Sequence, residues 1–258
     1  MRRLVVALAL LCLAAPAAQA APSPKLHVIF DEGLTVRGMV DRAAAVRGIA
    51  MRTRHVTPAL TGKAYAAAVA AAKPPKGFGR PTSLEGFLFP DTYEFGPATR
   101  AAEIVAMQQR RFAQQWAKVK LPAGRKPYDV LIVASMVERE TVVPAERPLV
   151  SAVIWNRLAK GMPLGIDASL RYGLGIQGTK AITAKQQQSD SPYNTNRFKG
   201  LPPTPIGNPG LASLQAAAHP AAVDYLFYVR EPESTSHYFT ADEADFCAKA
   251  VEFGYRGC

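Results

Sequence analysis

Apolar residues recur along this chain mainly at the three-to-four-residue period of amphipathic helices. Val36, Met39, Val40 and Ala43 form one such stripe, which ends at Gly48. The helices predicted from this pattern cover residues 36–46, 65–72, 101–119, 129–141, 145–160, 213–218 and 242–253. Short apolar or alternating runs predict strands at 26–30, 225–230 and 237–240. Segregated helices and short strands of this kind are typical of the α+β class.

Glycine and proline divide the predicted elements into two groups. Residues 73–80 are basic and hold two prolines and two glycines, a composition typical of a linker. This predicts a small N-terminal module at 25–75 and a larger domain at 82–258. Within the larger domain, residues 173–210 are rich in Gly, Pro, Ser, Asn and Gln, so we expect mostly loop there.

The first residues have the pattern of a targeting segment. Arg2 and Arg3 precede a short apolar run, and Ala18 and Ala20 are the small residues that a signal peptidase reads. The apolar run is shorter than the roughly 20 residues that a membrane-spanning helix needs. We therefore interpret residues 1–20 as a signal peptide, with a short membrane anchor as the alternative.

The charge of the chain is strongly basic. The formal net charge is +11, and removal of Arg2 and Arg3 with the leader would lower it to +9. A basic surface suits polyanions such as nucleic acid, acidic membranes and the carboxylate-bearing cell wall. Because export separates the protein from nucleic acid, we expect no nucleic-acid partner.

Cysteine and histidine usage argues against a metal site. Cys247 and Cys258 lie eleven positions apart near the C-terminus. In an oxidising compartment they are candidates for a disulfide that closes a small loop. The four histidines are scattered without metal-ligand spacing. We expect no metal site.

Two glutamates lie on the predicted helix 129–141, and either is a candidate acid. Glu138 and Glu140 are two residues apart, so their side chains leave the helix in different directions. Each follows apolar residues at helical spacing, and burial raises a carboxyl pKa toward the range useful for a general acid. The pattern does not choose between them. The structural alternative is a buried ion network with nearby arginines: Arg139, Arg147 and Arg157.

Several motifs of the larger domain occur in a familiar order. Residues 84–93 read LEGFLFPDTY, and residues 134–141 read ASMVERET. Further matching segments lie at 146–148, 156–158, 161–164, 191–195, 200–203, 208–210 and 225–227. Together they resemble the endolytic murein transglycosylases, the YceG-like or MltG family, over about residues 83–251. Upstream, residues 32–35 and the following helix resemble the small LysM-like module of that family.

The resemblance implies a reaction that needs no cofactor. Members of the family cleave the MurNAc-GlcNAc β-1,4 bond within nascent strands and leave a 1,6-anhydro-MurNAc end. By carry-over onto this motif, Glu138 is expected to be the single acid/base. Ordinary glycosidases need two carboxyls. Here the sugar's own C6 hydroxyl attacks, so one carboxyl can protonate the leaving oxygen and then deprotonate that hydroxyl.

Positions in the matching motifs imply supporting roles for further residues. Glu140 is expected to orient or tune Glu138. Three neighbouring residues are expected to bind sugar hydroxyls or N-acetyl groups: Tyr193, Asn194 and Thr195. Asp167 and Glu85 are expected either to hold loops or to contact substrate.

The chain also departs from the family pattern. Asp167-Ala168-Ser169 stands where an Asp-Pro-Thr or Asp-Pro-Ser is usual, and Asn196 stands where a tyrosine is frequent. These departures concern the substrate subsites. The N-terminal module and the membrane helix typical of the family are shorter here.

The resemblance also implies partners and a location. We expect a monomeric exported protein that acts on peptidoglycan glycan strands, alongside peptidoglycan synthases. It would be soluble in the periplasm or tethered to the inner membrane through its N-terminus. Two alternatives remain: a muramidase that uses water, with Glu140 or Asp167 as second carboxyl, and a non-catalytic peptidoglycan-binding regulator of wall synthesis.

Overall fold

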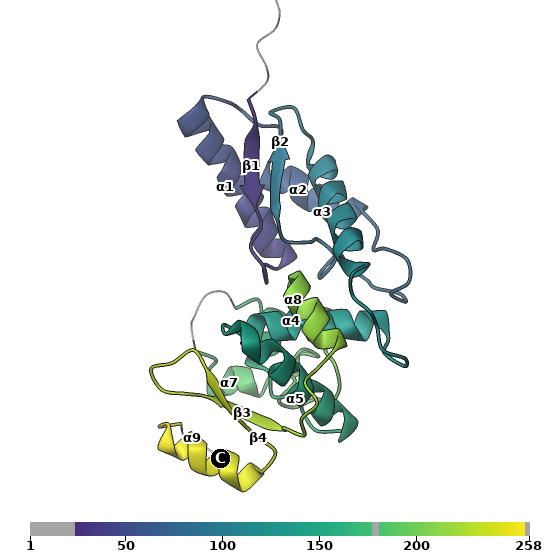
Figure 1. The fold of residues 1–258 in the computed structure, drawn as a ribbon. Helices are drawn as coiled ribbons and strands as arrows, with labels where there is room; N and C mark the ends of the chain where they lie inside the picture. The colour runs from purple at the N-terminus through teal and green to yellow at the C-terminus, as the bar shows by residue number, and fades with distance from the viewer. Residues whose placement is uncertain (1–23, 177–180, 256–258) are drawn as a thin grey trace, which may run out of the picture.

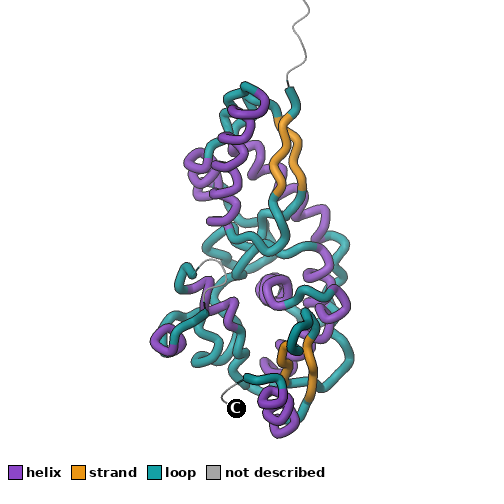
Figure 2. Tube along the Cα trace, turned by 90° about the vertical axis from the view of Figure 1, so that its left-hand side faces the viewer, coloured by secondary structure: helices purple, strands orange, loops and turns teal. Residues whose placement is uncertain are grey.

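The computed structural model describes residues 24–176 and 181–255. Within these ranges the chain forms nine α-helices and two small antiparallel sheets of two strands each (Figures 1 and 2). This confirms the α+β class. The expected leader at 1–20 lies outside the described residues. None of the described helices is both long and apolar enough to span a membrane.

The first part of the molecule contains one sheet and three helices (upper half of Figure 1). Its elements are β1 (Leu26–Ile29), α1 (Val36–Arg54), α2 (Gly62–Ala71), β2 (Thr92–Phe95) and α3 (Ala101–Trp116). β1 pairs antiparallel with β2, and Val28 lies opposite Tyr93. Val28 and Tyr93 are both buried. This register therefore turns the face of the sheet that carries them toward the helices.

The second part is mainly helical and ends in a hairpin. Its helices are α4 (Pro127–Glu140), α5 (Arg147–Ala159), α6 (Asp167–Gly173), α7 (Ala184–Gln187), α8 (Leu211–Ala218) and α9 (Glu243–Glu252), with a 3₁₀ turn, η1 (Pro144–Glu146). The hairpin strands are β3 (Phe227–Arg230) and β4 (His237–Thr240). α4 packs against both α5 and α8, while α9 packs on the hairpin.

The helix pattern is largely confirmed, with two kinds of difference. The end expected at Gly48 is wrong, because α1 continues to Arg54. A glycine inside a helix costs only about 1 kcal/mol, and burial of Ala50 beyond it favours continuation. β2 and α6 were not predicted. Each has seven residues or fewer, too short to display a period of its own.

The expected linker is an ordered connection. β1 and β2 pair across it, so the first sheet takes one strand from each side of residues 73–80. Phe78, within this stretch, is buried and meets the ring of Phe87 edge-on at 5.0 Å between centroids. The division at 25–75 and 82–258 and the LysM-like character of the first module stay predictions.

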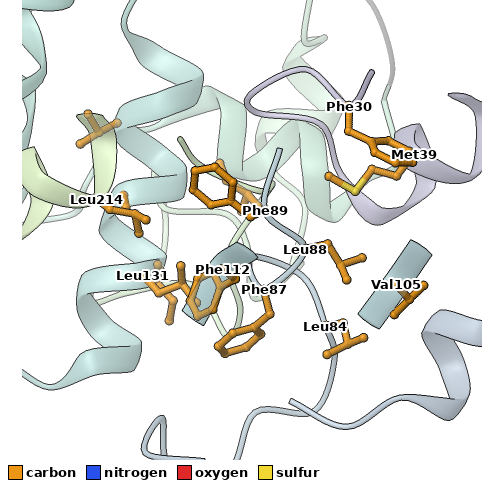
Figure 3. Close-up of a cluster of buried hydrophobic side chains, with 14 of the residues drawn as sticks. Phe30, Met39, Leu84, Phe87, Leu88, Phe89, Val105, Phe112, Leu131 and Leu214 are labelled. Carbon is orange, nitrogen blue, oxygen red and sulfur yellow. The ribbon is translucent and has the colours of Figure 1, made fainter. Parts of the chain in front are cut away.

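One hydrophobic core runs through both parts. Figure 3 shows Phe30 and Met39 from the first part near Leu88, and Phe87 and Phe112 beside Leu131 of α4. Leu131 and Leu88 are fully buried. The core therefore holds α4 in place, and the residues at the C-terminal end of α4 are positioned by it.

Candidate active site

α4 carries both candidate glutamates out of the core. Pro127 occupies its first turn, where a missing N–H costs nothing. Every residue from Val130 to Val137 is buried, and the helix ends at Glu140. Glu138 and Glu140 therefore lie at the edge of the core, on different sides of a rigidly held helix end.

Glu138 faces the first part of the molecule and the loop before α8. Its Oε2 accepts a hydrogen bond of 2.9 Å from the backbone N–H of Gly210, and its Oε1 lies 3.6 Å from Nη2 of Arg147. The carboxyl of Glu32 occupies the space where a Cβ on Gly210 would stand. Burial and the charge of Glu138 raise the pKa of Glu32. Glu138 thus ties α4 to α5 and to the loop before α8, and it lies beside Glu32 in the segment that follows β1.

Glu140 faces the hairpin and α6 instead. The hydroxyl of Tyr228 donates a hydrogen bond of 3.1 Å to its Oε2, and the N–H of Ala168 donates another. Burial raises the pKa of Glu140, and the charge of Asp167 raises it further. Burial and a like charge keep this carboxyl protonated at higher pH, which is the property a general acid requires.

Glu140 lines a cavity of about 610 Å³. Other polar groups in its walls come from α4, α5, α6 and the hairpin: Arg139, Arg157, Asp167, Tyr228, Arg230 and His237. Glu138 does not line this cavity. A cavity of this size with several convergent polar groups and a perturbed carboxyl has the features of a binding or catalytic site.

The walls of the Glu140 cavity are fixed by hydrogen bonds. Nδ1 of His237 lies 2.7 Å from Oε2 of the buried Glu146. Arg157 donates from Nη1 to the carbonyl oxygen of Leu164 at 2.9 Å. Asn196 donates from Nδ2 to Oδ1 of Asp167 at 3.2 Å. These contacts hold the polar groups in place before any ligand arrives.

The loop beside α6 contains three expected site residues, Tyr193, Asn194 and Thr195. Asn194 is fully buried and donates to the carbonyl oxygens of Gln187 and Ser189. The hydroxyl of Thr195 accepts from the N–H of Ile166 at 2.9 Å, and the hydroxyl of Tyr193 bonds that of Thr204 at 2.8 Å. Their polar groups hold the loop, and contact with sugars stays a prediction for all three.

Glu85 lies apart from both α4 glutamates, in the wall of a second cavity of about 620 Å³. Its two oxygens accept from the N–H of Val36 at 3.0 and 3.1 Å, from the hydroxyl of Tyr172 at 3.1 Å and from Nδ2 of Asn208 at 3.0 Å. Burial raises the pKa of Glu85 to about 7. This carboxyl joins the start of α1 to α6 and to the loop before α8.

A family model for the YceG-like family matches residues 8–252. The chain belongs to the YceG-like family. It is 37% identical over 150 residues to an endolytic murein transglycosylase of Bacillus subtilis, a match that covers 57% of this chain and 41% of that relative. An endolytic murein transglycosylase of Streptococcus pneumoniae is 28% identical over 187 residues, which cover 69% of this chain and 34% of the relative. This YceG-like chain therefore spans well under half the length of these relatives.

A solved structure shares the fold. The crystal structure of a YceG-like protein from Listeria monocytogenes superposes with a TM-score of 0.70 at 26% sequence identity. The match covers 88% of this YceG-like chain and 76% of the Listeria chain. The likeness includes most of both parts described above.

The structure distributes the expected site residues of this YceG-like chain over four places. Glu140 and Asp167 share one cavity, and Glu85 lines the second cavity. Glu138 lies beside Glu32 and the N–H of Gly210. The loop beside α6 holds the other three, Tyr193, Asn194 and Thr195. Sequence reasoning missed Glu32 and Tyr228 as neighbours of the two α4 glutamates. Both residues belong to matched segments or lie beside them. However, no periodicity in the sequence indicates that the loop with Glu32 or the hairpin with Tyr228 packs against α4, which is far away in the chain.

The remaining expectations concern cysteine and metal. Within residues 24–176 and 181–255, no group of three or more His, Cys, Asp or Glu side chains is placed to hold a metal ion. Cys247 lies in α9, whereas Cys258 lies outside the described residues. The pairing of Cys247 with Cys258 stays a prediction.

Proposed function

We propose that this protein is a peptidoglycan lytic transglycosylase. It cleaves the MurNAc-GlcNAc β-1,4 bond within nascent glycan strands and leaves a 1,6-anhydro-MurNAc end. The names of its relatives support the class of activity. The observation that carries the proposal is geometric: the buried helix α4 carries two carboxyls to the edge of the core, and one of them, Glu140, lies in the wall of a cavity with several convergent polar groups.

Two carboxyls of α4 are candidates for the acid/base. The family motif favours Glu138, whereas the geometry favours Glu140. The N–H of Gly210 and the guanidinium of Arg147 contact the carboxyl of Glu138, and both groups can stabilise its charged form. Glu140 borders the cavity, and burial raises its pKa. We propose Glu138 as the acid/base, in line with the motif, and Glu140 as the alternative that the cavity supports.

In the proposed reaction Glu138 acts twice. It first donates its proton to the glycosidic oxygen as the bond from that oxygen to C1 of MurNAc breaks. The N–H of Gly210 and the guanidinium of Arg147 stabilise the resulting carboxylate. The carboxylate then takes the proton of the C6 hydroxyl while O6 bonds to C1. Glu138 is protonated again, and no water is consumed.

Asp167 has a place in the same reaction. It lines the Glu140 cavity, and its charge acts on Glu140. A carboxylate in the wall of this cavity stabilises the positive charge that develops at the anomeric carbon. The same observation supports the second candidate function, a muramidase in which Asp167 activates a water molecule.

The test compares two substitutions on purified glycan strands. We expect Glu138→Gln to lower the cleavage rate at least about 100-fold. Glu140→Gln should have a smaller effect, because Glu140 supports the reaction without transferring the proton. Mass analysis of the products should find 1,6-anhydro ends. Glu252→Gln, an exposed change in α9, is the control, and circular dichroism checks folding.

Each other outcome of this test has a defined meaning. If Glu140→Gln abolishes cleavage in a folded protein while Glu138→Gln does not, then Glu140 is the acid/base. Reducing MurNAc ends without anhydro product would establish the muramidase. Undisturbed wall synthesis in cells with Glu140→Gln and Glu138→Gln together would support a non-catalytic regulator.

The location and partners belong to the same proposal. The protein is exported, with residues 1–20 as signal peptide or inner-membrane anchor, and acts as a monomer on glycan strands near peptidoglycan synthases. Cell fractionation followed by measurement of the intact mass tests the location. A soluble protein cleaved near residue 20 indicates a signal peptide, whereas an uncleaved protein in the membrane fraction indicates an anchor.

A further inference from the structure

The second cavity, which we call the α1–α6 cavity, lies between the two parts of the molecule. Its volume is about 620 Å³. Its walls come from the start of α1, residues 83–85, the end of α4 and residues 171–176. Arg139 of α4 lines both this cavity and the Glu140 cavity. The two cavities are therefore neighbours on either side of Arg139.

The charges of the α1–α6 cavity favour an anion. Three arginines line it, Arg37, Arg139 and Arg171, against two acids, Asp41 and Glu85. The oxygens of Glu85 already accept hydrogen bonds from three groups of the protein. The cavity also borders the N-terminal end of α1, where the helix dipole is positive. An incoming carboxylate therefore meets mostly positive charge.

Arg37 is the arginine best placed to receive a ligand. It lies in the first turn of α1, is exposed, and has no hydrogen bond or ion pair with any residue in the described ranges. Its Nη1 lies 3.8 Å from the Cβ position of Gly175, on the opposite wall. The guanidinium therefore reaches across the cavity with its donors unused. An Arg fork binds a carboxylate through two parallel hydrogen bonds.

The rest of the lining is apolar and accepts small alkyl groups. Its apolar side chains come from both parts of the molecule: Leu34, Val36, Val69, Leu84 and Ile176. A ligand that fits these walls combines a carboxylate with short apolar groups. The peptide stem of peptidoglycan, with its lactyl and alanyl methyl groups and its free carboxylates, has this chemistry.

We propose that the α1–α6 cavity binds the carboxylate-bearing peptide stem of a MurNAc residue, with Arg37 as the group that binds the carboxylate. The inference rests on the proposed function, because the glycan strand must bind at the C-terminal end of α4 for a stem to reach past Arg139. It adds a preference: the protein distinguishes strands that carry stems from strands that have lost them.

Binding tests this inference directly. Isothermal titration uses the Glu138→Gln variant and short glycan fragments in three forms: with peptide stems, with stems whose carboxylates are amidated, and with stems removed by an amidase. We expect the stem-bearing form to bind about tenfold more tightly than the other two, as one charge-assisted hydrogen bond allows. Equal affinity for free and amidated stems would overturn the carboxylate assignment.

Substitution of Arg37 assigns the preference to this cavity. In the same background, Arg37→Gln should remove the tenfold preference and leave binding of stem-free fragments unchanged. Arg37→Lys should retain part of it, because the charge remains but the fork is lost. Arg52→Gln, on the same helix and outside the cavity, should change nothing. A preference that survives Arg37→Gln overturns the inference.

The two proposals fail in distinguishable ways. If the wild-type protein cleaves no glycan strand but the Arg37-dependent preference is present, the catalytic proposal fails and the stem site stands. If cleavage yields anhydro ends but stems do not change the affinity, the stem site fails alone. Absence of binding for all three fragments overturns the stem site as well.

Discussion

Glu138 and Glu140 differ in chemistry because different segments surround them. A guanidinium and a backbone N–H engage Glu138, whereas burial and the neighbouring charge of Asp167 act on Glu140. The hydrogen bond from Tyr228 partly opposes these effects, because it favours the carboxylate. Burial also raises the pKa of Tyr228, so this hydroxyl remains a donor.

Tyr228→Phe therefore tests which glutamate is the acid. Loss of the donor raises the pKa of Glu140 further, but it leaves the contacts of Glu138 with Arg147 and Gly210 in place. With Glu138 as the acid, we expect the alkaline limb of the kcat/KM profile to stay where it is in the wild type. A limb that moves to higher pH, with a maximal rate about tenfold lower, would instead support Glu140.

Glu85 makes a separate prediction at the residue scale. Its pKa is about 7 in the folded protein and close to 4.5 when unfolded. Between these values the folded state binds more protons, so the free energy of unfolding should fall as pH rises from about 4.5 to 7. The contribution that is lost amounts to about 2–3 kcal/mol. Urea unfolding of wild type and Glu85→Gln at several pH values should find a shallower slope in the variant, because only the parts due to Glu32 and Glu140 remain.

At the scale of elements, α4 depends on close packing by neighbouring loops. Gly86 has φ +88°, and a Cβ there would lie 2.7 Å from Cγ of Pro205 and 3.2 Å from Leu131 of α4. No side chain fits between these groups. The glycine lets the loop that carries Glu85 approach α4 closely.

Gly86→Ala should lower the free energy of unfolding by about 3 kcal/mol, through backbone strain and overpacking together. Gly124→Ala is the matched control, because Gly124 has φ +82° and nothing lies within 4 Å of its Cβ position. This control should cost only about 1 kcal/mol. Urea denaturation measures both, and equal losses would mean that the contact with Pro205 is unimportant.

At the scale of the whole molecule, Asn208 joins the two parts. It is fully buried, and its Nδ2 donates to the carbonyl oxygen of Leu34 at 2.9 Å and to Glu85 at 3.0 Å. Its Oδ1 accepts from the N–H of Leu88 at 2.9 Å. Its backbone also exchanges hydrogen bonds with Gly33 and Leu34. Together with the shared core, these bonds should make unfolding cooperative.

Asn208→Ala should weaken this coupling. It leaves buried groups unpaired, at a cost of about 3 kcal/mol. The two tryptophans report on the two parts, Trp116 from α3 and Trp155 from α5. In variants that keep only one of them, urea transitions should coincide for the wild-type background and separate with Asn208→Ala. Coincident transitions with Asn208→Ala would contradict this role.

Local pattern was sufficient for the long elements. The stripe that begins at Val36 and the apolar run of α4 predicted helices because helical periodicity is a property of neighbouring residues. β2 was beyond such reasoning, since a strand of four residues is defined by its partner β1, far away in the chain. The same limit applies to Phe78, whose burial overrides the linker composition around it.

The sequence by itself determined the α+β class, most helices, the family and the presence of two glutamates at the end of one helix. Only the tertiary structure decided which glutamate meets a cavity, which one meets Glu32 and Arg147, and that Arg139 separates two cavities. The physical reason is that helix formation follows from local order along the chain. Burial, charge and pKa depend instead on segments that folding brings together.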